Sequence, residues 1–145
     1  MAIDVTATTT IARPREEVAT YVVDPANDLS WIRALTSARK LGEMDFGVGT
    51  QVERVAKMMG RSMPYTTEVT AYEAGAHLAM KAVAGPFPML VDYRFEDSGK
   101  GATPVSVRNR GGKGIMFRLF GWGIGRMVNG RVKGDLAQLK RALET

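Results

Sequence analysis

The sequence contains no cysteine and a single histidine, His77. Without thiols the chain can form no disulfide framework, Cys-based zinc site, iron–sulfur cluster or cysteine nucleophile. One imidazole also leaves no two-histidine metal motif. These absences exclude the commonest protein metal sites, and we expect no cofactor.

The sequence also lacks long apolar runs. None approaches the roughly 20 residues that a membrane-spanning helix needs, and the first residues do not form the basic and apolar stretches of a secretory signal. With 145 residues, 45% of them hydrophobic and 24% charged, the composition is typical of one soluble globular domain over residues 1–145. We expect a cytoplasmic monomer or homodimer without stable membrane insertion.

Acidic residues are scarce near the C-terminal end of the sequence. Between Lys100 and Arg141 ten basic side chains occur with Asp135 as the one acidic residue, and the chain carries a net charge of +5. Such an excess favours anionic partners through its field. No recognised nucleic-acid motif accompanies it, so we expect no nucleic-acid partner.

The hydrophobic periodicity predicts a strand, two short helices, about six further strands and a long terminal helix. Apolar residues alternate with polar ones over residues 3–11, which indicates a half-buried strand. Pro14 suits the first turn of a helix that ends before Asp24-Pro25, and a second short helix is expected over Leu29 to Leu35, capped by Asp28 or Ser30. From Ala38 to Arg110 strand-length pieces alternate with turn residues, which favours an antiparallel meander.

Period two assigns one face of each later strand to the interior. The expected inward sets are Val52, Arg54, Ala56 and Met58; Tyr65, Thr67, Val69 and Ala71; Leu78, Met80 and Ala82; Met89, Val91, Tyr93 and Phe95; and Thr103, Val105 and Val107.

The segment from about Lys113 to Leu143 has the spacing of an amphipathic helix. Its apolar stripe comprises Phe117, Phe120, Ile124, Val128, Val132, Leu136, Leu139 and Leu143. Five glycines interrupt the helix, Gly121, Gly123, Gly125, Gly130 and Gly134. Each costs about 1 kcal/mol relative to alanine, so we expect either a packing reason for them or a locally irregular helix.

Five motifs mark the first helix, the passage into the sheet and the hairpins: Ile11-Ala12-Arg13-Pro14-Arg15-Glu16-Glu17-Val18, Asp24-Pro25-Ala26-Asn27 followed by Trp31, Gly47-Val48-Gly49-Thr50, Glu68-Val69-Thr70-Ala71-Tyr72-Glu73 and Gly101-Ala102-Thr103-Pro104-Val105. In these motifs the chain resembles the SRPBCC superfamily, the START-like helix-grip proteins, and in particular its polyketide cyclase/dehydrase family. The resemblance extends over nearly the whole chain. It implies an α+β helix-grip fold, in which a curved antiparallel sheet of about seven strands wraps around the terminal helix, with an apolar cavity between them.

Methionines and aromatic residues are the candidate ligand contacts. Met is flexible and polarizable and suits a surface that adapts to apolar guests, although it also fills ordinary cores. A buried Tyr or Trp adds a polar group that needs a partner. The candidate ligand-binding residues are Trp31, Arg54, Met58, Tyr65, Met80, Met89, Tyr93, Phe117 and Met127.

The period-two alternation also predicts the orientation of two polar residues, Arg54 and His77. Arg54 belongs to an inward set, where a guanidinium needs an anion or several acceptors, and it could hold a carboxylate or an oxyanion. A bulge near Gly47 or Gly49 would instead turn it to solvent. His77 precedes the inward Leu78 and is expected to face outward, which disfavours a role as general base. No catalytic residue is assigned.

We therefore expect a domain that binds a small lipophilic molecule, such as a lipid, sterol or polyketide-like compound. A polyketide cyclase/dehydrase-like enzyme with the same cavity is the alternative, with Arg and Tyr stabilising an enolate. A second alternative is peripheral membrane or partner binding through the basic face of the terminal helix, formed by Arg118, Arg126 and Lys133 around Trp122. A solvated outer face explains the same residues and is favoured.

Overall fold

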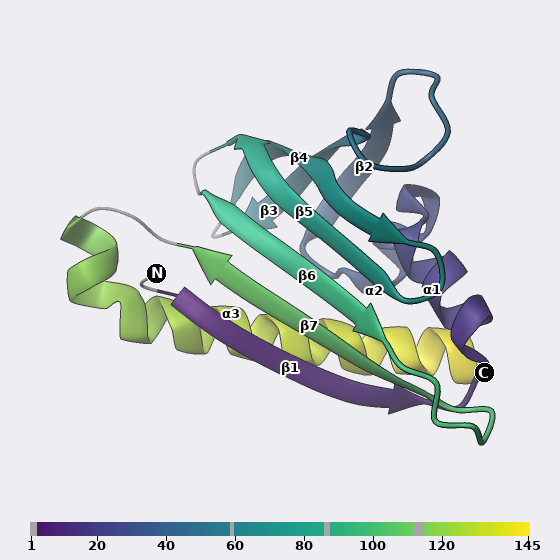
Figure 1. The fold of residues 1–145 in the computed structure, drawn as a ribbon. Coiled ribbons are helices and arrows are strands. Elements are labelled where there is room, and N and C mark those ends of the chain that lie inside the picture. The colour runs from purple at the N-terminus through teal and green to yellow at the C-terminus, as the bar shows by residue number, and fades with distance from the viewer. Residues whose placement is uncertain (1–2, 59, 86–87, 112–114) are drawn as a thin grey trace.

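The protein is a curved antiparallel sheet with one long helix across it (Figure 1). The computed structural model describes residues 3–58, 60–85, 88–111 and 115–145, and the side chains of these residues except 58, 115–122 and 124. Its elements are β1 (Ile3–Ile11), α1 (Arg15–Val23), the 3-10 turn η1 (Pro25–Asn27), α2 (Asp28–Trp31), β2 (Leu35–Leu41), β3 (Gln51–Met58), β4 (Arg61–Glu73), β5 (His77–Ala84), β6 (Met89–Phe95), β7 (Thr103–Gly111) and α3 (Ile115–Glu144).

The sheet has seven strands in the order β1-β7-β6-β5-β4-β3-β2, with every neighbouring pair antiparallel. The first strand, β1, does not pair with β2, the next strand in the sequence. It pairs instead with β7, from Ile3↔Gly111 to Ile11↔Thr103. Register shifts between Thr66 and Thr67 and between Val69 and Ala71 interrupt the pairing of β4 with β5. Such irregularities bend a strand and increase its twist, which suits a sheet that curves around a helix.

This architecture confirms the predicted α+β helix-grip class, with differences in the second short helix. That helix covers only Asp28–Trp31, whereas Leu35 already begins β2. Its N-cap is Asn27 and makes no side-chain capping bond. Asp28 does not cap the helix because its carboxylate turns to the sheet, as described below.

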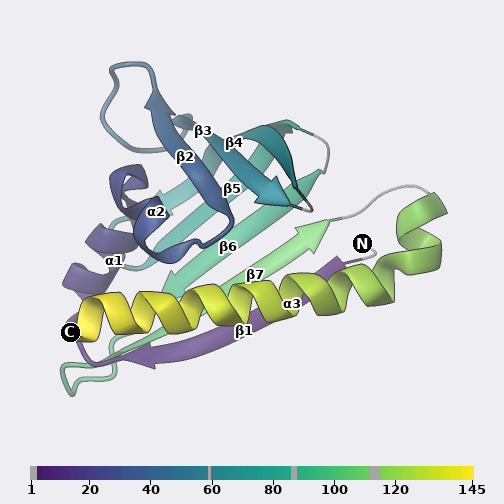
Figure 2. The same ribbon diagram turned by 180° about the vertical axis from the view of Figure 1, so that it is seen from behind.

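The long helix packs mainly against the edge strand β1 and against α2. Figure 2 shows α3 running along β1 on one face of the sheet, with α1 and α2 near its C-terminal end. None of the helices in the described part of the chain is long and apolar enough to cross a bilayer.

A packed core fills the space beneath the C-terminal half of α3. Its central members come from β1, α1, α2, β6, β7 and α3, and comprise Ala7, Ile11, Val18, Ala19, Val22, Trp31, Phe95, Val105, Val107, Leu136, Leu139 and Leu143. A smaller cluster is formed by Val69 of β4 with Leu78 and Met80 of β5. The predicted inward sets of β4, β5 and β7 thus supply core residues, because alternate side chains of a strand share one face.

The glycines of α3 differ in their surroundings. A Cβ on Gly134 would collide with the guanidinium of Arg33, whose Cζ would lie only 2.8 Å away, so here the missing side chain leaves room for a close contact. A Cβ on Gly130 would meet no described atom within 4 Å. The expected packing reason for the glycines therefore holds at Gly134 and fails at Gly130.

Replacing Gly130 with alanine is expected to raise the free energy of unfolding by up to about 1 kcal/mol, because alanine restricts the unfolded chain and favours the helix. The contrasting variant is Gly111→Ala in β7, whose Cβ would lie 2.5 Å from the Pro88 carbonyl oxygen and 2.7 Å from Met89 Sδ. Urea denaturation should show the first variant stabilised and the second destabilised. A loss of stability for Gly130→Ala would mean that this part of α3 needs the flexibility of glycine.

Candidate functional site

An apolar cavity of about 300 Å³ lies between the concave face of the sheet and α3, and is partly open to solvent. It adjoins the packed core and shares Trp31 and Val107 with it. The sheet contributes Ile3, Leu35, Ala56, Met63, Tyr65, Thr67, Ala82, Met89, Val91, Tyr93, Val107 and Asn109. The helical side and the α2–β2 connection contribute Trp31, Ile32, Ala34, Met127, Val128, Arg131, Val132 and Asp135. This volume is at the lower end of the range for small-molecule sites.

The topology gathers these residues from opposite ends of the sequence. Gly111 at the end of β7 pairs with both Ile3 and Met89, so the start of β1, the start of β6 and the end of β7 meet at one end of the sheet. The residue Val128 on α3 faces the same space. The curved sheet therefore forms most of the cavity wall, and one helical stripe completes it.

The predicted ligand contacts fall into three groups. Trp31, Tyr65, Met89, Tyr93 and Met127 line the cavity. Arg54 and Met80 are buried at 8% and 5% exposure but are not among its lining residues. The side chains of Met58 and Phe117 lie outside the described residues.

Arg54 points inward and is held by the protein's own carboxylate. Its Nε donates to Asp28 Oδ2 at 2.7 Å, and its Nη1 donates to Thr67 Oγ1 at 2.8 Å. Burial would lower the pKa of Arg54, but the adjacent Asp28 carboxylate outweighs it and the pKa is raised. The anion that the sequence pattern required is thus supplied by α2. The ion pair ties this short helix to the sheet behind the cavity wall.

Burial also changes the acidity of other groups near the cavity. It raises the pKa of Asp28, against the opposing effect of Arg54. It raises the pKa of the Tyr65 and Tyr93 phenols, again opposed by the charge of Arg54. Both phenols therefore stay protonated near neutral pH and can donate hydrogen bonds. Tyr93 also meets Trp31 edge-on, with ring centroids 6.4 Å apart.

Asp135 is the acidic residue on the helical side of the cavity. Its Oδ1 accepts from the Arg33 backbone N–H at 3.3 Å and from Arg33 Nε at 3.2 Å. This contact links the segment between α2 and β2 to α3, and the Arg33 guanidinium lies against Gly134. Burial raises the pKa of Asp135, although Arg33 and Arg131 act in the opposite direction.

A pH series should reveal the raised pKa of Asp135. As pH rises above 3.8 the unfolded chain loses this proton first, whereas the folded protein keeps it up to its raised pKa. Wild type should therefore lose stability relative to Asp135→Asn as the pH rises from 3.8 through the raised pKa of the folded protein. At pH values below 3.8 this loss should be absent. Urea denaturation of both proteins between about pH 3 and 7 measures the difference. A difference that changes in the opposite direction would show that Arg33 dominates over burial.

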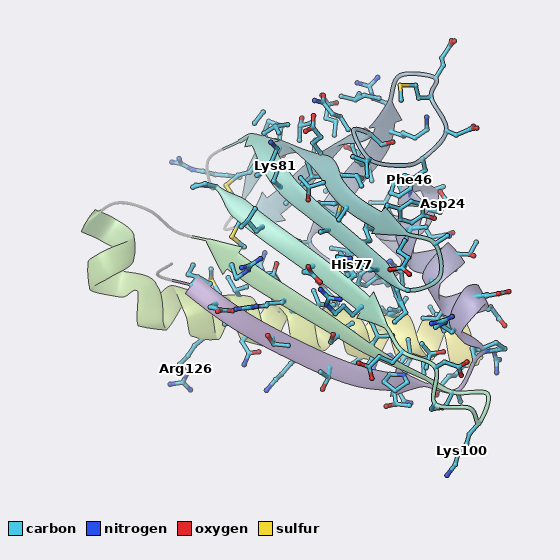
Figure 3. The ribbon with its side chains drawn as sticks, viewed as in Figure 1. Asp24, Phe46, His77, Lys81, Lys100 and Arg126 are labelled. Atoms are coloured by element: carbon cyan, nitrogen blue, oxygen red, sulfur yellow. The ribbon has the colours of Figure 1, made fainter. Side chains whose placement is uncertain are left out.

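His77 lies on the opposite face of the sheet, turned away from α3 (Figure 3). Its Nε2 is 3.0 Å from Asp92 Oδ2, and Asp92 also pairs with Arg94 at 3.3 Å. The alternating charges of β6 thus form contacts on the outer face. In the described part of the chain no group of three potential metal ligands from His, Asp and Glu is found.

Three polar residues of the cavity lining, Asn109, Arg131 and Asp135, and Asp28 behind its wall were not selected from the sequence as site residues. Asn109 follows Val105 and Val107 at period two, so the same alternation that placed Arg54 could have identified it. Asp28 carries no such signal, because its contact with Arg54 joins residues 26 positions apart. Asp135 lies next to the apolar stripe of α3, but its partner Arg33 is 102 positions away.

The chain matches one family model, described as polyketide cyclase / dehydrase and lipid transport, over residues 2–144. No match is found among curated protein sequences.

Solved structures of similar fold span nearly the whole chain. TTHA0849 from Thermus thermophilus is 17% identical with a TM-score of 0.82, covering 97% of this chain and 96% of that chain. The Zhui aromatase/cyclase from Streptomyces sp. R1128 is 14% identical with a TM-score of 0.79, covering 97% and 93%. A START superfamily protein from Mycobacterium smegmatis is 18% identical with a TM-score of 0.71, covering 97% and 94%. At these identities the likeness is one of fold.

Proposed function

Because the chain belongs to the polyketide cyclase / dehydrase and lipid transport family, we propose that it binds a small lipophilic molecule in the cavity between the sheet and α3. The observation that carries the proposal is the partly open, almost entirely apolar cavity beside a packed core. Burial of apolar ligand surface, at about 25 cal/mol per Å², would supply the driving force.

The proposed contacts come from both walls. Trp31, Tyr65 and Tyr93 offer aromatic surface with polar groups, and Met89 and Met127 offer adaptable apolar surface.

Two of the residues predicted as contacts act indirectly in this proposal. The pairing of Arg54 with Asp28 fixes α2 and therefore Trp31 at the end of that helix. Met80 supports the wall from behind through its contact with Thr67.

The test is a thermal-shift panel of fatty acids, sterols and aromatic polyketides, followed by titration calorimetry of any compound that stabilises the protein. A ligand present at about 100 times its dissociation constant should stabilise the folded state by about 2.7 kcal/mol. The variant His77→Ala, altered on the opposite face, should bind equally well. If no compound in any of the three classes shifts the unfolding temperature, the proposal is wrong.

A polyketide cyclase/dehydrase-like activity is the second candidate. It is favoured by the protonated phenols of Tyr65 and Tyr93, which could hydrogen-bond to an enolate as charge develops on it. The fold is shared with the Zhui aromatase/cyclase. Turnover of a poly-ketone mimic that falls at least tenfold in Tyr65→Phe, with binding retained, would support this activity. Absence of turnover in wild type would leave binding alone.

A further inference from the structure

Two buried hydrogen-bond donors of the cavity wall have no partner among the described residues. They are Nε1 of Trp31 and Nδ2 of Asn109. Both residues line the cavity, and they are only 4% and 7% exposed. Buried polar groups in folded proteins are nearly always hydrogen-bonded, because an unpaired one has lost its water without replacement. Two such donors in the lining of one cavity therefore indicate that a ligand supplies the acceptor.

The two donors lie on either side of Tyr93. The Trp31 ring contacts Tyr93 edge-on, whereas Asn109 pairs with Val91, which is two residues before Tyr93 on the same face of β6. Side chains at such diagonal positions are about 7–8 Å apart or less, so Trp31 and Asn109 are both neighbours of Tyr93. The polar groups thus form one part of an otherwise apolar cavity.

The charges around the cavity are largely matched within the protein. Asp28 neutralises Arg54, and Arg33 pairs with Asp135. Arg131 is half-buried on the helical side and favours the ionised form of Asp135. Arg131 is the one cation among the described lining residues, and it is already beside Asp135, so a ligand carboxylate beside Trp31 and Asn109 would lose its hydration with little compensation.

We propose that the cavity takes an uncharged ligand with carbonyl-type oxygens, which accept hydrogen bonds from the unpaired donors of Trp31 and Asn109, and that it discriminates against carboxylates of the same shape. This inference rests on the proposed function. A carbonyl oxygen accepts without donating, so it can pair with either of these N–H groups. A hydrocarbon would leave both donors unpaired.

The test compares three probes of nearly equal shape: 2-acetylnaphthalene, 2-ethylnaphthalene and 2-naphthoate. Titration calorimetry at about pH 7 should show the ketone binding at least about tenfold more tightly than the carboxylate, because the anion would lose its hydration with little compensation. The ketone should also bind more tightly than the hydrocarbon, although its polar oxygen makes it the less hydrophobic of the two.

Two variants identify the donors. Trp31→Phe and Asn109→Leu each remove donor groups while keeping apolar volume. At least one of them should weaken the ketone by about three- to tenfold relative to the hydrocarbon, as expected for the loss of one hydrogen bond to its single carbonyl. Taking the ratio of two probes within each variant cancels any general change in stability or packing. Arg131→Gln serves as the third variant, since it removes the half-buried cation.

The outcomes separate the two proposals. Tighter binding of 2-naphthoate that is lost in Arg131→Gln would overturn the selectivity, as would equal binding of ketone and hydrocarbon in wild type and variants. In both cases ligand binding in the cavity would stand. If none of the three probes binds, this inference is wrong, and the thermal-shift panel decides whether the proposed function is wrong as well.

Discussion

Replacing Arg54 with methionine is expected to lower the free energy of unfolding by about 3–5 kcal/mol, because it leaves the Asp28 carboxylate buried without its partner. Both side chains are almost fully buried, at 9% and 2% exposure, and their contact is 2.7 Å. Thr67 Oγ1 would lose its donor as well. Urea denaturation at about pH 7 measures the loss.

The double variant Arg54→Met with Asp28→Leu is the matched control. Apolar residues of similar volume often replace a buried ion pair without loss of stability, so most of the stability should return. A single variant that loses less than about 1 kcal/mol would place the interaction in the range of exposed ion pairs and contradict the structure.

Filling the cavity should abolish binding while the fold is retained. Ala82 lies on the inner face of β5 and lines the cavity. Ala82→Phe would place a ring in the space of the ligand, and we expect affinity for 2-acetylnaphthalene to fall at least about tenfold, equivalent to about 1.4 kcal/mol. Stability should stay equal or rise by about 0.5–2 kcal/mol, because cavity filling commonly stabilises proteins.

The control for this variant is Ala79→Phe in the same strand. Ala79 alternates with the buried Leu78 and Met80, so its side chain lies on the opposite face. Its affinity for the probe should equal that of wild type. An Ala82→Phe protein that is folded and still binds with unchanged affinity would locate the ligand elsewhere.

The fold could be predicted from the sequence because its signals are local and agree with one another. Alternation at period two placed Val52, Val69 and Leu78 on the inner face, and all three are buried. The spacing of Leu136 and Leu139 likewise predicted the buried face of the long helix. The boundaries of the second helix were wrong, since a helix of 4 residues depends on its packing more than on its own sequence.

The site was harder to predict because its electrostatics join distant parts of the chain. Alternation alone could place Arg54 on the inner face, but it could not show that Asp28 neutralises it there. The same holds for Asp135, whose partner Arg33 comes from the connection before β2. Which buried donors remain unpaired depends on all surrounding side chains, so Trp31 could be selected as a polar aromatic residue but not as an unpaired donor.

The methionines allow the most direct test of the cavity as a ligand site. Met63, Met89 and Met127 line it, whereas Met44 is 70% exposed in the loop between β2 and β3. In protein labelled at the methionine methyl groups, a titration with 2-acetylnaphthalene followed by NMR should shift the Met63, Met89 and Met127 signals together, through the ring current of the probe. The Met44 signal should remain in place. Saturable binding that leaves the three lining methionines unchanged would contradict a ligand between the sheet and α3.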